Sequence, residues 1–555
     1  MKSKNIRHSK NLRCFTNMDI IYKNLRTILK KSKCVMWVYR QVKAKTEQEY
    51  SNTEMQFIKK NSTLWKESKK KYDDKILVDF TTLAPDNFWG VMKKAEAVRE
   101  GKGYQICVCL KGKGKFDFNN YEIIKSFNPD EIIFEEKESH KAECLYNTIK
   151  LFFIFFYAAQ RHSVESFIDY TFKKIKIGDC IYDTILRWQS DLYTIDGFSI
   201  SSWEMFWGAA KEFAVAISLM KNNNFKVYFS PESAYLRKIR QRVFIERGVQ
   251  TWIVNEFLDV QYTKENMYAP LLSINNFYTN AELKNMSISQ CNIEKAEKYF
   301  NNRLSGMITK FDAGKSFGRK ETISKEKILN YFGIKNKYNN ILLASHVFSD
   351  AVHGNRQYIF KDYYEWLIYC LKKLSEIPYV NVFLKMHPSR DGYGENDISD
   401  YIERKYRYIH RVPDEWSTAA VLESMDVVLT AAGTIGLEAA CLGKPTMLVA
   451  ESYYSGTGIV PVAHNLGEYE RFLLSLPHMR ENDDPALKSY AKFVLYMAQE
   501  RRRKSKIDLS KFSIMPGDNW TGKVTEQYEY LNQMIENISN VKDDEYKYWM
   551  EIEGV

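Results

Sequence analysis

The stretch that begins Ile341-Leu-Leu-Ala-Ser-His346 and ends Met447-Leu-Val-Ala-Glu451 decides the fold, because three of its loops directly follow short apolar runs. In an open parallel sheet, loops of this kind meet at the carboxyl ends of the strands, where ligands bind. The stretch therefore predicts a pocket. Its walls are the loops Ser345-His-Val-Phe-Ser-Asp-Ala-Val-His-Gly354, Lys385-Met-His-Pro388 and Ala431-Ala-Gly-Thr-Ile-Gly-Leu-Glu-Ala439.

The third loop has the strongest local pattern. After the apolar run that ends at Leu429, Gly433 permits a tight turn, and a helix that begins near Thr434 presents unpaired backbone N–H groups. The hydroxyl of Thr434 adds a donor, and Glu438 lies one turn further on, where it can accept from sugar hydroxyls. This geometry favours a phosphate site, although a plain strand-to-helix turn explains the same glycine.

The other two loops contain His346, His353 and His387, three of the nine histidines. Beside His387, the cations Lys385 and Arg390 suit a phosphate or diphosphate leaving group. The spacing of the histidines with Asp350 matches no established metal site, so a general base or a phosphate contact is the favoured interpretation.

Carboxylates after other apolar runs are candidates for the base. Asp86, Asp179 and Asp183 follow strand-like segments of the first half of the chain, at positions that face the expected cleft. Taken singly, the position of each favours a helix cap over a base.

The alternation of short strands and helices predicts an α/β fold with two Rossmann-like domains that face a central cleft. Among the individual elements, we expect a helix to start at Ser230–Ser233, a helix over Tyr363–Leu374 and a strand over Thr446–Val449. A chain of 555 residues is too long for one core, and its 45% apolar and 27% charged residues are ordinary for a folded protein. We expect five segments: a basic helical extension (1–74), a first α/β domain (75–265), a connector (266–337), a second α/β domain (338–477) and carboxyl-terminal helices (478–555).

The net charge of +12 is concentrated near the amino terminus. A solvated basic face explains it, as does attraction to anionic lipid or to a polyanionic substrate. No nucleic-acid recognition module accompanies it. Nine scattered cysteines indicate reduced thiols in a cytoplasmic protein, and no signal-peptide pattern is present. The strongest apolar run, Leu151–Ala159, is too short to span a bilayer and predicts a buried helix.

Lys-Met-His-Pro388 and Gly-Thr-Ile-Gly-Leu-Glu-Ala-Ala-Cys-Leu-Gly-Lys-Pro445, together with the first loop, resemble bacterial GT-B glycosyltransferases. More narrowly, they resemble the capsule polysaccharide biosynthesis group, which includes the Kdo transferases and is distantly similar to the polyglycerol-phosphate transferases of teichoic acid synthesis. The match is good over residues 340–460 and vaguer over 75–265.

The resemblance implies that the second domain holds a nucleotide-sugar donor and the first an acceptor, with no cofactor and no metal. It implies nine residues for the donor site, and it leaves open which of three further residues is the catalytic base. The donor set is Ser345, His346, Ser349, Lys385, His387, Gly433, Thr434, Gly436 and Glu438, and the candidate bases are Asp350, His353 and Asp183.

The function implied is transfer of a sugar to a growing capsule or O-antigen-type glycan or glycolipid. We expect a cytoplasmic protein with peripheral contact to the inner face of the membrane. The alternatives left open are a glycerophosphotransferase or sugar-nucleotide epimerase of the same fold, and a non-enzymatic scaffold.

Overall fold

A computed structural model describes fourteen stretches of the chain. The expected basic extension lies outside them up to residue 49, and its described part is helix α3 (Asn52–Leu64). The stretches are 50–65, 73–80, 85–112, 121–189, 192–254, 259–270, 273–308, 313–318, 320–335, 337–354, 359–395, 397–500, 505–512 and 519–552.

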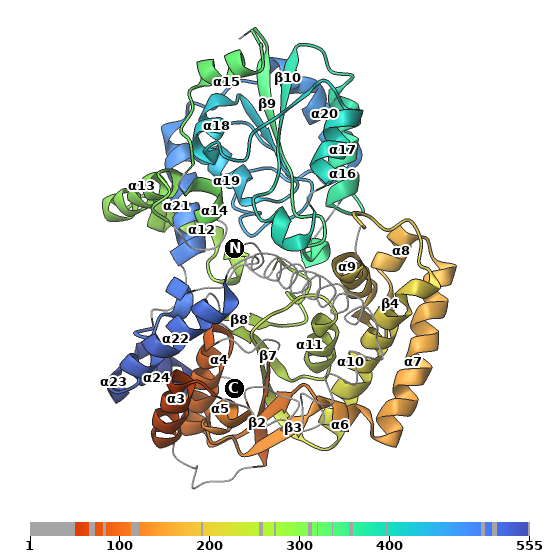
Figure 1. The fold of residues 1–555 in the computed structure, drawn as a ribbon, viewed down its shortest axis with the longest axis vertical. Helices are drawn as coiled ribbons and strands as arrows, with labels where there is room; N and C mark the ends of the chain where they lie inside the picture. Colours follow the sequence, from red (N-terminus) through yellow and green to blue (C-terminus); the bar gives the residue numbers. More distant parts are fainter. Residues whose placement is uncertain are drawn as a thin grey trace, which may run out of the picture.

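Two separate sheets form the centres of two α/β units, stacked along the long axis of the molecule (Figure 1). The first sheet has the order β3-β2-β1-β6-β7-β8, parallel except for β8, and the second has the order β11-β10-β9-β12, parallel throughout. The expected α/β fold class, with two domains built on largely parallel sheets, is confirmed. The strands are β1 (Asp74–Asp79), β2 (Gln105–Leu110), β3 (Glu131–Phe134), β6 (Asn224–Ser230), β7 (Gln250–Val254), β8 (Asp259–Tyr262), β9 (Asn339–Ala344), β10 (Val380–Lys385), β11 (Ile409–Arg411) and β12 (Val427–Leu429).

Each face of the first sheet is covered by helices because alternate side chains of β1 and β2 point to opposite faces. Leu77 and Cys107 pack on one core, whereas Ile76 and Val108 pack on another. The helices of this unit are α4 (Pro85–Lys102), α5 (Tyr121–Lys125), α6 (Glu135–Ser139), α7 (Ala142–Arg161), α8 (Val164–Ile168), α9 (Gly178–Trp188), α10 (Trp203–Lys221) and α11 (Arg237–Glu246), with a hairpin of β4 (Thr171–Phe172) and β5 (Ile175–Lys176).

The second sheet follows the same rule. On β9, Ile341 and Leu343 pack toward α16, and Leu342 packs toward α18. The connecting segment adds helices, of which α13 packs against α21 and the core beside α19. These helices are α12 (Asn280–Ser287), α13 (Gln290–Leu304), α14 (Ala313–Phe317), α15 (Lys325–Tyr331), α16 (Tyr363–Leu374), α17 (Ile398–Lys405), α18 (Thr418–Ser424), α19 (Thr434–Cys441), α20 (Leu466–Ser475) and α21 (Pro485–Glu500).

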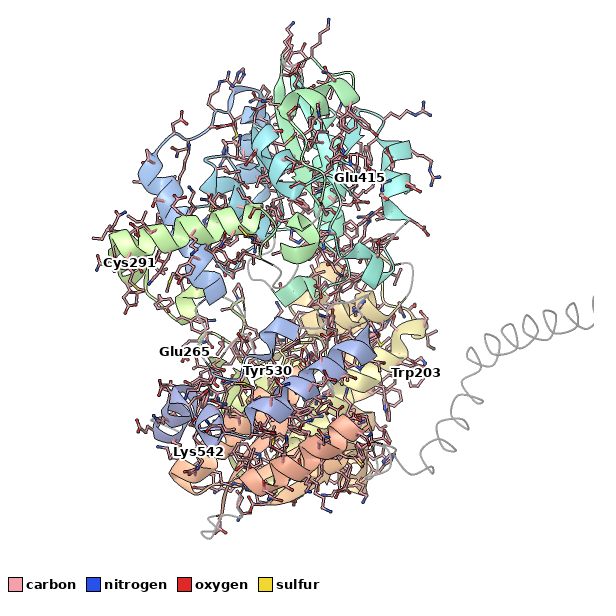
Figure 2. The ribbon with its side chains drawn as sticks, turned by 60° about the vertical axis from the view of Figure 1, so that its left-hand side comes forward. Trp203, Glu265, Cys291, Glu415, Tyr530 and Lys542 are labelled. Carbon is pink, nitrogen blue, oxygen red and sulfur yellow. The ribbon has the colours of Figure 1, made fainter. Side chains whose placement is uncertain are left out.

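The last helices return to the first unit. Figure 2 shows the helix that carries Tyr530 lying along the first domain, where α22 packs against α3 and α24 packs against α4. These helices are α22 (Trp520–Met534), α23 (Ile538–Val541) and α24 (Asp544–Glu551).

Three expectations about individual elements were wrong. The stretch Ser230–Ser233 does not begin a helix: the Gln241 side chain donates to the carbonyl of Glu232 (2.6 Å), and α11 starts later. Residues Thr446–Val449 form no strand beyond an isolated bridge at Leu448. The run Leu151–Ala159 is a half-buried helix, with Phe155 buried and Phe153 64% exposed.

None of the helices in the described stretches has both the length and the apolar character needed to cross a membrane. The longest apolar run lies in α7, where Lys150 precedes it and Gln160 and Arg161 follow it. This finding concerns helices alone.

Candidate functional site

A cavity of 610 Å³ opens where β9, β10 and β12 end. The loops after these three strands form its walls, as expected for the carboxyl edge of a parallel sheet. The structure therefore brings most of the predicted donor residues together. Those that line the cavity are Ser345, His346, Lys385, His387, Gly433, Thr434 and Glu438, and the candidate base Asp350 lines it as well.

The amino terminus of α19 faces this cavity without a side-chain cap. Gly433 is the N-cap residue, and it provides no side-chain hydrogen bond to the start of the helix. The loop before it is fixed from behind, because Ser452 Oγ donates to the carbonyl of Ala432 and Tyr454 Oη donates to that of Gly433, both at 2.7 Å. The leading N–H groups and the positive end of the helix dipole are thus held toward the cavity.

Gly433 has no room for a side chain. A Cβ there would lie 2.8 Å from Thr430 Oγ1 and 3.3 Å from His346 Cε1. Gly436 does not line the cavity; a Cβ at that position would lie 2.6 Å from Tyr454 Oη. The first glycine lets the loop approach His346, and the second lets α19 pack closely.

His346 holds the glycine loop as a neutral ring. The N–H of Ala432 donates to His346 Nε2 (3.3 Å), and the ring stacks on Tyr363 with centroids 4.2 Å apart. Burial and the neighbouring His387 lower the pKa of His346 to about 3. Because Nε2 accepts, the ring proton lies on Nδ1.

His387 and Lys385 give the opposite wall its polarity. The N–H of His387 donates to Ser345 Oγ (3.0 Å), and the N–H of Ser389 donates to His387 Nδ1 (3.2 Å). In the neutral ring the proton therefore lies on Nε2. Burial, followed by the charge of Lys320, lowers the pKa of Lys385 to about 8. This wall presents positively polarised groups to a ligand.

Glu438 forms an ion pair with Arg303, a residue that the sequence analysis did not predict to be part of the site. Arg303, from α13, donates through Nε to Glu438 Oε1 at 2.7 Å, and both residues line the cavity while being largely buried. Arg303 lies 135 positions from Glu438 in the chain, in a segment without motif character. The carboxylate is thereby fixed in orientation.

The first loop is shaped by Glu395, which the sequence also did not single out. Its carboxylate accepts from the N–H of Phe348 (3.0 Å) and from both the N–H and the hydroxyl of Ser349 (2.9 and 2.7 Å). Ser349 thus supports the loop and does not line the cavity. Asp350 does line it, and accepts from the hydroxyl of Tyr235 (3.3 Å), a residue of the first domain.

His353 and Asp183 form a buried contact between the domains, outside the cavity. His353 Nδ1 lies 2.6 Å from Asp183 Oδ1, and Nε2 lies 3.1 Å from the carbonyl of Lys361. Both partners can only accept, so both ring nitrogens donate and the ring is an imidazolium. The carboxylate of Asp183 accordingly raises the pKa of His353 against the effect of burial.

The remaining first-domain carboxylates have structural partners. Asp179 forms a two-pronged pair with Arg242 at 2.6 and 2.8 Å, and Asp86 accepts from the side chain of Asn87. Across the described stretches, no three His, Cys, Asp or Glu side chains gather closely enough to hold a metal ion.

No protein-family model and no curated protein matches this chain. Solved structures do resemble it. A Thermosulfurimonas dismutans KpsC described as a beta Kdo 2,4 transferase has 13% sequence identity and a TM-score of 0.29, over 48% of this chain and 79% of that one.

Two further structures cover more of the chain. UDP-GlcNAc 2-epimerase from Neisseria meningitidis, bound to UDP-GlcNAc, has 10% identity and a TM-score of 0.23, over 77% of this chain and 100% of that one. Anabaena HepE, in complex with UDP-glucose, has 12% identity and a TM-score of 0.24, over 82% and 99%. Likeness at this level carries no conclusion about the reaction or the substrate.

Proposed function

We propose that this protein is a GT-B glycosyltransferase that moves a sugar from a nucleotide-sugar donor to a growing surface glycan of the capsule or O-antigen type. The observation that carries the proposal is the uncapped amino terminus of α19, which faces Lys385 and His387 across one cavity. A helix amino terminus and a cation on opposite walls suit a phosphate group between them.

Transfer of the sugar leaves negative charge on the donor phosphate. Lys385, the Nε2–H of His387 and the dipole of α19 are placed to stabilise that charge, which is what a divalent cation does in other enzymes. The proposal therefore includes no metal and no cofactor. The transition state has oxocarbenium character, as in glycoside chemistry generally.

Two carboxylates take different roles in this proposal. Glu438, oriented by Arg303, binds ribose or sugar hydroxyls. Asp350 is the proposed base, because it alone among the three candidates lines the cavity, whereas His353 and Asp183 neutralise each other outside it. Asp350 is also exposed and lies beside Tyr235 of the first domain, where an acceptor hydroxyl would approach.

The acceptor is a glycan or glycolipid in this proposal, made at the inner face of the cytoplasmic membrane. Support comes from α7, whose outer face carries apolar and basic side chains together. Leu145, Tyr146, Ile149, Phe153 and Tyr157 are exposed there, with Lys150 and Arg161 beside them. Such a face suits peripheral contact with an anionic bilayer.

Nucleotide binding tests the donor site directly. Gly433→Ala places a Cβ 2.8 Å from Thr430 Oγ1, so the glycine loop must move, and we expect affinity for the preferred nucleotide among UDP, CDP, CMP and GDP to fall at least ~10-fold. Gly197→Ala is the matched control, because a Cβ at Gly197 meets nothing within 4 Å. Isothermal titration calorimetry provides the affinities.

Absence of binding by all four nucleotides at millimolar concentration would contradict the proposal, as would equal affinities of the two variants. A labelled donor then separates the reactions. A glycosyltransferase moves label to an acceptor, a glycerophosphotransferase moves a glycerophosphate unit, and an epimerase converts its donor with no acceptor present.

A further inference from the structure

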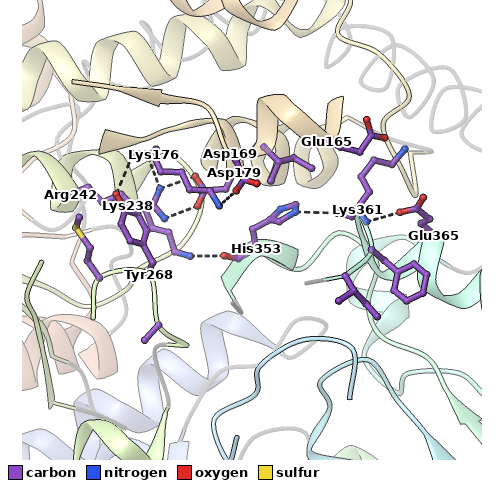
Figure 3. A pocket seen from close by; sticks show the side chains of 15 residues that line it. Glu165, Asp169, Lys176, Asp179, Lys238, Arg242, Tyr268, His353, Lys361 and Glu365 are labelled. Carbon is purple, nitrogen blue, oxygen red and sulfur yellow. Dashed lines mark hydrogen bonds and ion pairs between the residues drawn. The ribbon is translucent and has the colours of Figure 1, made fainter. Parts of the chain in front are cut away.

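A second cavity, of 440 Å³, lies between the two domains (Figure 3). The first domain contributes Lys238 and Arg242 from α11, and the second contributes His353 and Lys361. The two cavities are neighbours, because Asp350 and Gly354 line the donor cavity and His353, from the same loop, lines the second one. A ligand here would therefore lie one loop away from a bound donor.

Most charged side chains that line this cavity are already paired. Arg242 binds Asp179 at 2.6 and 2.8 Å, and Lys176 binds Asp169 at 2.6 Å. Lys361 binds Asp196 at 3.0 Å. These ion pairs fix the positions of the cavity walls. Their charges are largely neutralised, so they contribute little to the binding of a charged ligand.

Lys238 is the exception among the buried cations of this cavity. Its side chain is buried, with 8% of the residue exposed, yet no carboxylate of the described stretches lies within 4 Å of its ammonium group. The contact that the structure gives to Nζ is a long one, 3.5 Å to the carbonyl of His353. Burial and the neighbouring Arg242 lower the pKa of Lys238, so its charge is held at a cost.

The rest of the cavity wall is apolar and aromatic. Tyr268 packs against Arg242, whose guanidinium lies 4.8 Å from the ring centroid, and Phe360 lines the side of the second domain. Aromatic rings and a few placed polar groups are typical of sites for small polar organic ligands. A single unpaired cation in such a wall selects a ligand with one negative group.

We propose that this cavity binds an acidic sugar unit of the acceptor, with its carboxylate or phosphate on Lys238 and its ring between Tyr268 and Phe360. The assignment to the acceptor rests on the proposed function, whereas the anion site itself does not. Because walls of both domains contact the ligand, the bound sugar would also tie the domains together beside the donor cavity.

The position of the cavity supports an acceptor more than a second donor. Its lining includes the carboxylates Glu165, Asp169, Asp179 and Glu365, whose negative charge disfavours a diphosphate. Its rim residues Glu165 and Asp169 are exposed, which leaves a path for a longer chain to leave toward solvent. One sugar can thus be held while the remainder of the glycan extends outward.

The test uses the full-length protein without nucleotide and three probes: glucuronate, glucose 6-phosphate and glucose. Ligand-observed NMR titration gives the affinities. We expect at least one of the two acids to bind ~10-fold or more tightly than glucose, and Lys238→Met to remove that preference. The acid that binds identifies carboxylate or phosphate as the preferred group. Lys174→Met, an exposed lysine on the neighbouring hairpin turn, should leave it unchanged.

Thermal unfolding distinguishes a binding role from a structural one. Because Lys238→Met replaces a buried ammonium that forms no ion pair within 4 Å in the described stretches, the variant should melt at the same or a higher temperature than the wild type. No preference for either acid in the wild type would overturn the proposal, as would a preference that Lys238→Met retains. Neither result depends on nucleotide binding, so failure here and failure of the glycosyltransferase proposal remain distinct.

Discussion

Burial of Lys385 should set the pH range over which the proposed site binds a phosphate. Lys385 is 7% exposed, lines the proposed donor cavity, and has a pKa lowered to about 8 by burial and Lys320. A ligand phosphate binds the charged ammonium, so affinity is fully present below this pKa and falls as the pH rises through it. We expect the affinity for UDP to fall by up to ~10-fold between pH 8 and pH 9, measured by calorimetry.

The terminal phosphate of UDP is already ionised at these pH values, so the fall belongs to the protein. Lys385→Met supplies the control: it should bind UDP more weakly at pH 7 and show little change up to pH 9. An unchanged slope in this variant would show that another group titrates, and would remove Lys385 from the proposed phosphate site.

At the scale of elements, one face of α7 is exposed to solvent along the whole helix. It lies along the outer edge of the first domain (Figure 1), and Phe153 and Tyr157 are 64% and 60% exposed. Insertion of these two rings into the lipid interface would stabilise binding by ~1.5 kcal/mol or more each. Phe153→Ser with Tyr157→Ser should therefore reduce sedimentation with vesicles of phosphatidylglycerol and phosphatidylcholine at least ~10-fold.

Leu474→Ser is the matched control, since Leu474 is 69% exposed on α20 in the other domain and should not affect vesicle binding. Vesicles of phosphatidylcholine alone should bind more weakly than the mixed ones, because Lys150 and Arg161 meet no anionic lipid there. Equal sedimentation of both variants would exclude α7 as the membrane contact.

Elements with a clear period were predictable from the sequence. Helix α16 spans Tyr363–Leu374, as its apolar spacing predicted, whereas the helix expected at Ser230 is replaced by a turn that Gln241 closes from a distance. The residues of the candidate site also fall into a predictable and an unpredictable group. Local motifs predicted the loops around Gly433 and His387, but Arg303 and Glu395 contact the site through tertiary interactions that no sequence motif reveals.

The importance of tertiary contacts also explains the outcome for His353. The sequence predicted its loop correctly but did not predict that its side chain lies in a buried contact between the domains. Its loop was identified by its position after a strand, yet its partner Asp183 comes from the other domain, 170 positions away. Burial and pairing of this kind depend on how two domains meet. A short window of sequence therefore predicts neither the burial of His353 nor its pairing partner.

At the scale of the whole molecule, helices that follow the second domain in the sequence pack on the first domain. Among them, α24 covers one face of the first sheet. Trp549 is fully buried there, with its ring 4.9 Å from that of Trp252 and 5.4 Å from that of Phe229. Lys93 of α4 is bound at 2.8 Å by Asp543 in the turn before the same helix.

The first domain should therefore depend on residues more than 400 positions away from its first strand. Trp549→Ala removes a large buried ring and should cost ~3–5 kcal/mol of unfolding free energy. Trp520→Ala, at the half-exposed start of α22, should cost less than ~0.5 kcal/mol. Denaturant unfolding followed by tryptophan fluorescence compares them. A similar loss in both variants would mean that α24 is an appendage, whereas a loss confined to Trp549→Ala would show that the carboxyl-terminal helices are part of the first domain's core.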